Sequence, residues 1–237
     1  MKYKNLLIIG TSHVAQQSLD EITLAFQQHK PDIVAVELDR KRLHALLSDE
    51  HAAPNLSAIR KVGLKGYLFA VIGGFLQRKL GNVVGVKPGS EMKLAVELAK
   101  KIDAKIALID QDIEVTLKKF SLSITWREKF RFVIDVFNSL LFRKKTLAEL
   151  GIGPDVLDLS KVPEKELVKK LMLQLKGRYP NVYSVLVKER NRIMANNIAK
   201  LIDKFPDENV LVVIGAGHED DVFEMVKKSM QGKVDIV

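Results

Sequence analysis

The sequence contains no cysteine, which excludes disulfides, thiolate zinc sites and cysteine nucleophiles. It also lacks a long apolar run: no stretch approaches the roughly 18 residues needed to span a bilayer. The N-terminal residues lead into only about five apolar residues before Gly10, too few for the apolar region of a signal peptide. We therefore expect a soluble, cytoplasmic protein. With 237 residues and 47% apolar content, the chain suits one large domain with insertions, over residues 1–237.

Acidic residues are scarce in two regions of this basic chain, whose formal net charge is +9. Residues 52–90 hold six basic residues and no acid, and residues 118–147 hold eight basic residues and two acids. A nucleic-acid-binding protein could have this charge pattern. The sequence has no RNP-like, helix-turn-helix or KH motif, so we expect no nucleic-acid partner. Solvated lysine-rich faces explain the same excess.

Two similar motifs lie near the ends of the chain. The apolar run 6–9 leads into Gly10 and then His13, and the apolar run 210–214 leads into Gly215 and then His218. Each pattern predicts a buried strand that ends at a Gly-x-x-His turn. Open α/β sheets bind ligands at the carboxyl ends of their strands, so we expect the two histidines to meet there. The glycines would permit unusual dihedral angles and a close approach of ligand to main chain.

The rest of the chain predicts an α/β fold with a mostly parallel central sheet flanked by helices. Crossover helices between the strands imply parallel pairing. Expected strands are 5–9, 33–37, 105–110 and 210–214, with a short edge strand at 234–236. Expected helices are 14–30, 41–49, 91–103 (capped by Ser90), 164–176, 181–205 and 220–230. Helical, lid-like insertions are expected over 52–90 and 118–180, with a loop at 151–163.

Acidic residues follow two of the predicted strands and should lie beside the histidines. Glu37 and Asp39 follow one strand, and Asp110 and Asp112 follow another. Two imidazoles with one or two carboxylates suit a divalent ion such as Mn, Co, Zn or Fe, which lowers the pKa of bound water. A histidine paired with a glutamate could also act as a general base without metal. Asp110 and Asp112 could instead cap helices.

Three further residues are candidates for the site. Arg190 could clamp an anion or carbonyl, with Glu189 as ligand or base. Both could equally belong to a solvated helix face. Glu91 opens a predicted helix, where its charge offsets the helix dipole, and it could also reach the site. Ser12 is a poor nucleophile candidate because Gly-x-Ser-x-Gly is missing.

Six sequence blocks resemble the TraB/PrgY family, within the broader group that includes GumN and the TIKI proteases. The blocks are GTSH at 10–13, PDIVAVELDRKRLHAL at 31–46, VKPGSEM at 86–92, LIDQDIEVTL at 108–117, ERNRIMA at 189–195 and VIGAGH at 213–218. The resemblance implies a peptidase-like fold whose activity, in the TIKI branch, needs manganese or cobalt. It carries over His13, His218, Glu37, Glu189 and Arg190. Gln111 stands where the family usually has arginine.

The sequence therefore favours a metal-dependent hydrolase of the metallopeptidase type that acts on peptides. His13 and His218 would hold the ion, with Glu37 as a further ligand or base and Arg190 stabilising the oxyanion. In the pheromone-shutdown branch, the resemblance implies limiting a secreted peptide signal. The alternative is a non-catalytic module that sequesters a peptide or small anionic ligand, so catalysis itself stays open.

Two basic segments, 60–79 and 126–145, combine apolar stripes with clustered Lys and Arg. We expect a helical lid over the site that could lie on an anionic membrane surface, peripheral to it. Packing as a helical subdomain or as a homodimer contact explains the same pattern.

Overall fold

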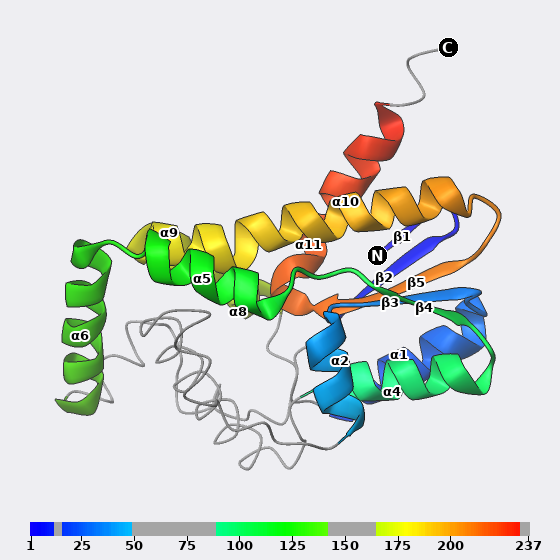
Figure 1. Cartoon of the computed structure of the whole chain (residues 1–237), viewed down its shortest axis with the longest axis horizontal. Helices are drawn as coiled ribbons and strands as arrows, with labels where there is room; N and C mark the ends of the chain where they lie inside the picture. The colour runs from blue at the N-terminus through cyan, green and yellow to red at the C-terminus, as the bar shows by residue number, and fades with distance from the viewer. Residues whose placement is uncertain (12–15, 49–88, 142–164, 233–237) are drawn as a thin grey trace.

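The fold is α/β, as the sequence predicts. The computed structural model describes residues 1–11, 16–48, 89–141 and 165–232 (Figure 1). Several predicted features therefore lie wholly or almost wholly outside the described residues: the insertion 52–90 with its segment 60–79, the loop 151–163, the strand 234–236 and His13. Among the helices in the described ranges, none combines the length and the apolar character needed to cross a membrane.

A five-stranded sheet runs through the middle of the molecule in the order β1-β2-β5-β3-β4. Its strands are β1 (Lys2–Tyr3), β2 (Leu6–Thr11), β3 (Ile33–Val36), β4 (Lys105–Leu108) and β5 (Val210–Gly215). Pairing is parallel except between β1 and β2, which form a short antiparallel pair that the sequence analysis did not predict.

Helices cover both faces of this sheet (Figure 1). In chain order, the helices are α1 (Gln16–His29), α2 (Arg40–Leu47), α4 (Ser90–Lys101), α5 (Ile113–Ser123), α6 (Trp126–Leu141), α8 (Lys165–Arg178), α9 (Pro180–Tyr183), α10 (Glu189–Lys204) and α11 (Ala216–Gln231). A π-helical turn, η2 (Ser184–Lys188), joins α9 to α10, so the long helix expected from 181 to 205 is interrupted.

Alternation along β5 divides the core into two layers. Val210, Val212 and Ile214 pack against α10 and α11, whereas Leu211 and Val213 pack against α1 and α4. All five are fully buried, as expected for a central parallel strand with helices on both faces. This packing fixes where the carboxyl ends of the strands, and the residues that follow them, lie.

Two helix starts differ from the sequence predictions, and a third agrees with a role that they considered. Gly89, not Ser90, is the N-cap of α4, and its φ of 86° is left-handed, a conformation that glycine adopts without strain. Helix α11 begins at Ala216, directly after β5, so His218 lies in its first turn and not in a preceding loop. Helix α5 begins after the N-cap Asp112, one of the roles considered for that residue.

Candidate functional site

Charged side chains from four elements converge at the carboxyl edge of the sheet, around Arg190 near the start of α10. Its Nε lies 3.1 and 3.2 Å from the two carboxylate oxygens of Asp110, and its Nη2 lies 2.6 Å from Asp110 Oδ2. Nη2 also bonds Glu37 Oε1, while Nη1 lies 3.2 Å from the carbonyl oxygen of Leu186 and 3.3 Å from His218 Nε2. All five guanidinium N–H groups therefore have an acceptor in the described structure.

The charge of Arg190 is held in a mostly buried position. Its side chain is 15% exposed, and the side chains of Glu37 and Asp110 are 7% and 0% exposed. Burial lowers the pKa of Arg190, but the charge of Glu37 and the hydrogen bonds that Arg190 donates to Asp110 outweigh it, and the net pKa is raised. The Leu186 carbonyl that accepts from Arg190 belongs to the π-helical turn η2, a feature often found at functional sites.

Glu37 joins three elements through its two carboxylate oxygens. Oε2 accepts a hydrogen bond of 2.6 Å from the backbone N–H of Gly215, at the end of β5. Oε1 accepts from Arg190 and lies 3.5 Å from His218 Nε2. A strand-end carboxylate is thus brought beside an imidazole that is 181 residues away in the sequence, as the strand-end argument anticipated.

The orientation of His218 is set by two residues that the sequence analysis did not single out. Asn191 Nδ2 lies 3.0 Å from Asp221 Oδ2, and a carboxylate only accepts, so the amide nitrogen faces Asp221. Asn191 Oδ1 therefore faces His218 Nδ1, at 2.5 Å, and Nδ1 carries the proton. The lone pair of neutral His218 is then on Nε2, which faces Glu37 and Arg190. Asn191 is fully buried. Its position directly after the candidate residue Arg190 is the feature of the sequence that could have pointed to it.

The neighbouring acids serve mainly as helix caps. Asp39 Oδ1 accepts from the backbone N–H groups of Lys41 and Arg42, at the start of α2. Asp112 Oδ1 accepts a hydrogen bond of 2.7 Å from the backbone N–H of Glu114, at the start of α5. Arg42, which the sequence analysis overlooked, bonds both Asp39 and Asp110 and so ties α2 to the cluster.

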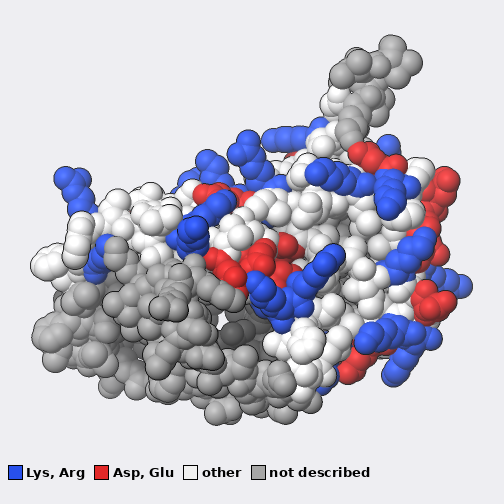
Figure 2. Space-filling model, viewed as in Figure 1, with Lys and Arg blue, Asp and Glu red and all other residues white. Residues whose placement is uncertain are grey.

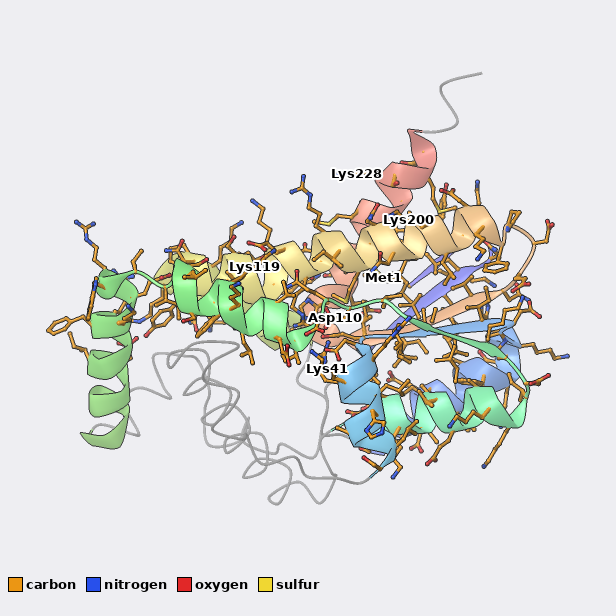
Figure 3. All side chains as sticks on the ribbon, in the orientation of Figure 1. Met1, Lys41, Asp110, Lys119, Lys200 and Lys228 are labelled. Carbon is orange, nitrogen blue, oxygen red and sulfur yellow. The ribbon has the colours of Figure 1, made fainter. Side chains whose placement is uncertain are left out.

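Asp112 and Glu114 are exposed at the surface, whereas the side chains of Asp39 and Asp110 are buried. Figure 2 shows acidic side chains gathered in the middle of one face with Lys and Arg around them, and Figure 3 labels Asp110, Lys41 and Lys119 in the same part of the view. Lys41 forms ion pairs of 3.1 and 3.0 Å with Asp112 and Glu114.

Two other predicted site residues belong to α10 and α4, and a third lies outside the described residues. Glu189 forms an ion pair with Lys119 of α5 and is about one third exposed. Glu91 is fully buried in the first turn of α4. His13 is not among the described residues, and within the described ranges no group of three or more His, Asp or Glu could hold a metal ion. The structure thus brings together Glu37, Asp110, Arg190 and His218.

The strands that lead into the two Gly-x-x-His motifs are adjacent, since Gly10 pairs with Ile214 and Thr11 with Gly215 in the parallel β2–β5 register. The expectation that both glycines allow unusual dihedral angles is wrong for Gly215, whose φ is −64°. Gly10 is required for a different reason. A Cβ there would lie 2.7 Å from Glu219 Oε2 and 2.9 Å from Glu219 Cβ, so only glycine lets β2 approach α11 this closely.

A cleft of about 610 Å³ adjoins the cluster, between α1, α8 and the first turn of α11. This volume suits a small organic ligand or a few peptide residues. Val168, Met172 and Leu173 form its apolar wall on α8, and Glu219, Asp220 and Asp221 form its acidic wall on α11. Asp221 therefore links the cleft, through Asn191, to His218.

Comparison with known proteins agrees with the sequence blocks. The TraB/PrgY/gumN family matches residues 2–229. An uncharacterized protein of Methanocaldococcus jannaschii is 35% identical over 232 residues, which cover 96% of this chain and 55% of that protein. The TraB domain-containing proteins of Homo sapiens and Mus musculus are 25% and 24% identical over 195 residues, or 78% of this chain and 49% of each relative.

The chain thus spans about half the length of the curated relatives it matches. The family match covers all five strands of the sheet and every described residue of the cluster around Arg190. The chain belongs to the TraB/PrgY/gumN family.

Proposed function

We propose that this domain is a metal-dependent hydrolase of the metallopeptidase type that acts on peptides. One observation carries the proposal: the imidazole Nε2 of His218 lies 3.5 Å from Glu37 Oε1, and Asn191 places the ring proton on the other nitrogen, Nδ1. Both groups lie at the carboxyl edge of the sheet, where open α/β folds bind ligands.

The described residues fit part of a metal site. A neutral imidazole and a carboxylate are suitable ligands for Mn, Co, Zn or Fe, and ligands about 2.0–2.2 Å from one ion lie about 3–3.5 Å apart. The bond from His218 Nδ1 to Asn191 is the kind of support that metal-bound histidines use. Catalytic sites commonly have three protein ligands. We propose His13, two residues beyond the end of β2, as the third. A bound ion would polarise the scissile carbonyl and lower the pKa of water.

The remaining steps fall to the chain's own residues. Glu37 acts as a further ligand or as the base that takes the proton of the attacking water and returns it to the leaving amine. Arg190 is bonded to both Glu37 and His218. To stabilise the oxyanion, Arg190 must release at least one of these bonds, because all its N–H groups are engaged. Asp110 keeps the guanidinium in place during that change.

Metal analysis of protein purified without chelator is the first test. We expect about one equivalent of a first-row divalent ion per chain, lost in His218→Asn and reduced in Glu37→Gln. The exposed His44 on α2 provides the matched control His44→Asn, which should keep the metal. Circular dichroism verifies that each variant is folded.

A quenched peptide library, incubated with and without Mn²⁺ or Co²⁺, is the second test. Metal-stimulated cleavage that is absent in His218→Asn supports the hydrolase. A folded protein that neither retains metal nor cleaves any peptide contradicts it.

One observation favours a second candidate, a module that binds a peptide without cleaving it. Arg190 already bonds the buried carboxylates of Glu37 and Asp110, and Arg42 also bonds Asp110, so both carboxylates have a cationic partner without an ion. The adjoining cleft, with its apolar and acidic walls, would hold the ligand. Peptide binding that is unaffected by chelator, without turnover, would support this candidate over the hydrolase.

A further inference from the structure

The helix α6 lies at the far end of α5, away from the sheet (Figure 1). Its apolar residues Trp126, Phe130 and Ile134 recur at every fourth position and therefore form one stripe along the helix. Their exposed fractions are 82%, 71% and 43%, and Leu122 at the end of α5 is 78% exposed. Large side chains of this kind rarely stay exposed together in a soluble domain without a binding role.

Positive charges border this stripe. A shallow groove on the surface is lined by Trp126, Phe130 and Ile134 together with the cations Arg127, Lys129, Arg131 and Arg178. Lys129 Nζ lies 4.3 Å above the centre of the Trp126 ring, which holds cation and aromatic side by side.

The acids of α6 point the opposite way. Glu128 is 4% exposed and accepts hydrogen bonds of 2.8 and 3.1 Å from the backbone and side chain of Asn181 in α9. Asp135 accepts from Arg178 and Tyr179 at the end of α8. Arg131 also faces this side, since its Nη1 donates to the carbonyl oxygen of Arg178 at 2.7 Å. The helix thus turns its acids and Arg131 toward α8 and α9, and Arg127, Lys129 and the apolar stripe outward.

We propose that this outer face of α6, defined by Trp126, Phe130, Ile134, Arg127 and Lys129, docks on an anionic membrane surface. The aromatic and aliphatic side chains would enter the headgroup boundary, and the cations would meet the lipid phosphates. Charge complementarity selects this occupant. A second copy presenting the same cationic face would be repelled, which opposes a symmetric dimer through α6. The proposal is independent of the hydrolase activity.

The chain contains its own probe, because Trp126 is its only tryptophan. Vesicles of phosphatidylcholine with about one third phosphatidylserine should shift the tryptophan emission to the blue at low salt and bind the protein in sedimentation. Pure phosphatidylcholine vesicles should do neither, and high salt should release the protein because exposed charges are screened. Absence of a blue shift with anionic vesicles contradicts the proposal.

Two double variants test whether vesicle binding depends on the outer face of α6 or only on the net charge of the chain. Arg127→Ser with Lys129→Ser removes two positive charges, and each should lower the vesicle partition coefficient about fivefold. Lys200→Ser with Lys228→Ser removes the same charge from α10 and α11, away from α6 (Figure 3), and should lower it much less. Equal losses in the two pairs would overturn the proposal.

An apolar variant and a solution measurement complete the test. Phe130→Ser with Ile134→Ser keeps the charge and should still weaken vesicle binding. Light scattering of the protein without vesicles tests the remaining alternative, a homodimer through α6. A protein that is a dimer, and becomes a monomer in this variant, would assign the face to a second copy and contradict the membrane proposal.

Discussion

The cluster around Arg190 and the outer face of α6 both contain arginine, but its charge is buried and paired in the first and lies at the surface in the second. Arg190 is mostly buried and all its N–H groups bond to Glu37, Asp110, His218 and a backbone carbonyl. On α6, the acids turn inward and the cations remain at the surface beside exposed aromatics. Burial makes the first arrangement costly to disturb, whereas the second costs the fold little and is available to a partner.

The largest effect should follow the loss of Arg190. Arg190→Met leaves the buried carboxylate of Glu37 without its arginine and leaves Asp110 with Arg42 alone, and we expect a loss of about 3–5 kcal/mol in the free energy of unfolding. Urea denaturation measures this loss. Arg192→Met, at an exposed position of the same helix, should change stability by less than about 0.5 kcal/mol. Similar losses for the two variants would contradict the claim that the buried cluster around Arg190 stabilises the fold.

A smaller effect should follow the loss of Asn191. Asn191→Ala leaves His218 Nδ1 without its acceptor in a buried position, which should cost about 1–3 kcal/mol of folding free energy. Nitrogen chemical shifts of the imidazole should also show a weaker preference for the proton on Nδ1. The exposed Asn196 supplies the control Asn196→Ala, which should leave both measurements unchanged. If the His218 tautomer is the same in both variants, Asn191 does not orient it.

Acid should loosen the attachment of α6. The hydrogen bonds of Arg178 hold the pKa of Asp135 below its ordinary value of 3.8, so its stabilising effect is present above that value. It is lost as the pH falls through the lower pKa of the folded state. The pair is partly exposed, so the effect should be at most about 1 kcal/mol. Trp126 fluorescence anisotropy should fall in this acid range, and Asp135→Asn should show the low anisotropy already at neutral pH.

The smallest effect should come from the α6 stripe itself. Phe130→Ser, at a position that is 71% exposed, should change stability by less than about 0.5 kcal/mol. Phe120, 5% exposed in α5, is the matched comparison: Phe120→Ser should cost about 3–5 kcal/mol in the same denaturation experiment. A large loss for Phe130→Ser would mean that the stripe stabilises the fold and is not a free docking surface.

Local patterns in the sequence were sufficient for the sheet and for part of the site. Apolar runs bounded by turn residues located four of the five strands, because a strand buried on both faces must be apolar throughout. Parallel pairing followed from the intervening helices, and it places the residue after each strand at one edge. Glu37, Asp110 and His218 could therefore be expected to lie near one another before any contact was known.

Contacts between distant elements needed the tertiary structure. The bond from Asn191 to His218, the link from Arg42 to Asp110, and the approach of Glu219 to Gly10 join segments 27, 68 and 209 residues apart. No local pattern marks such pairs, because their partners become neighbours only when helices pack on the sheet. The orientation of α6, with acids inward and the apolar stripe outward, likewise depends on where α8 and α9 lie. By itself, the sequence determined the elements and the strand edge that carries the chemistry; packing decided which side chains meet there.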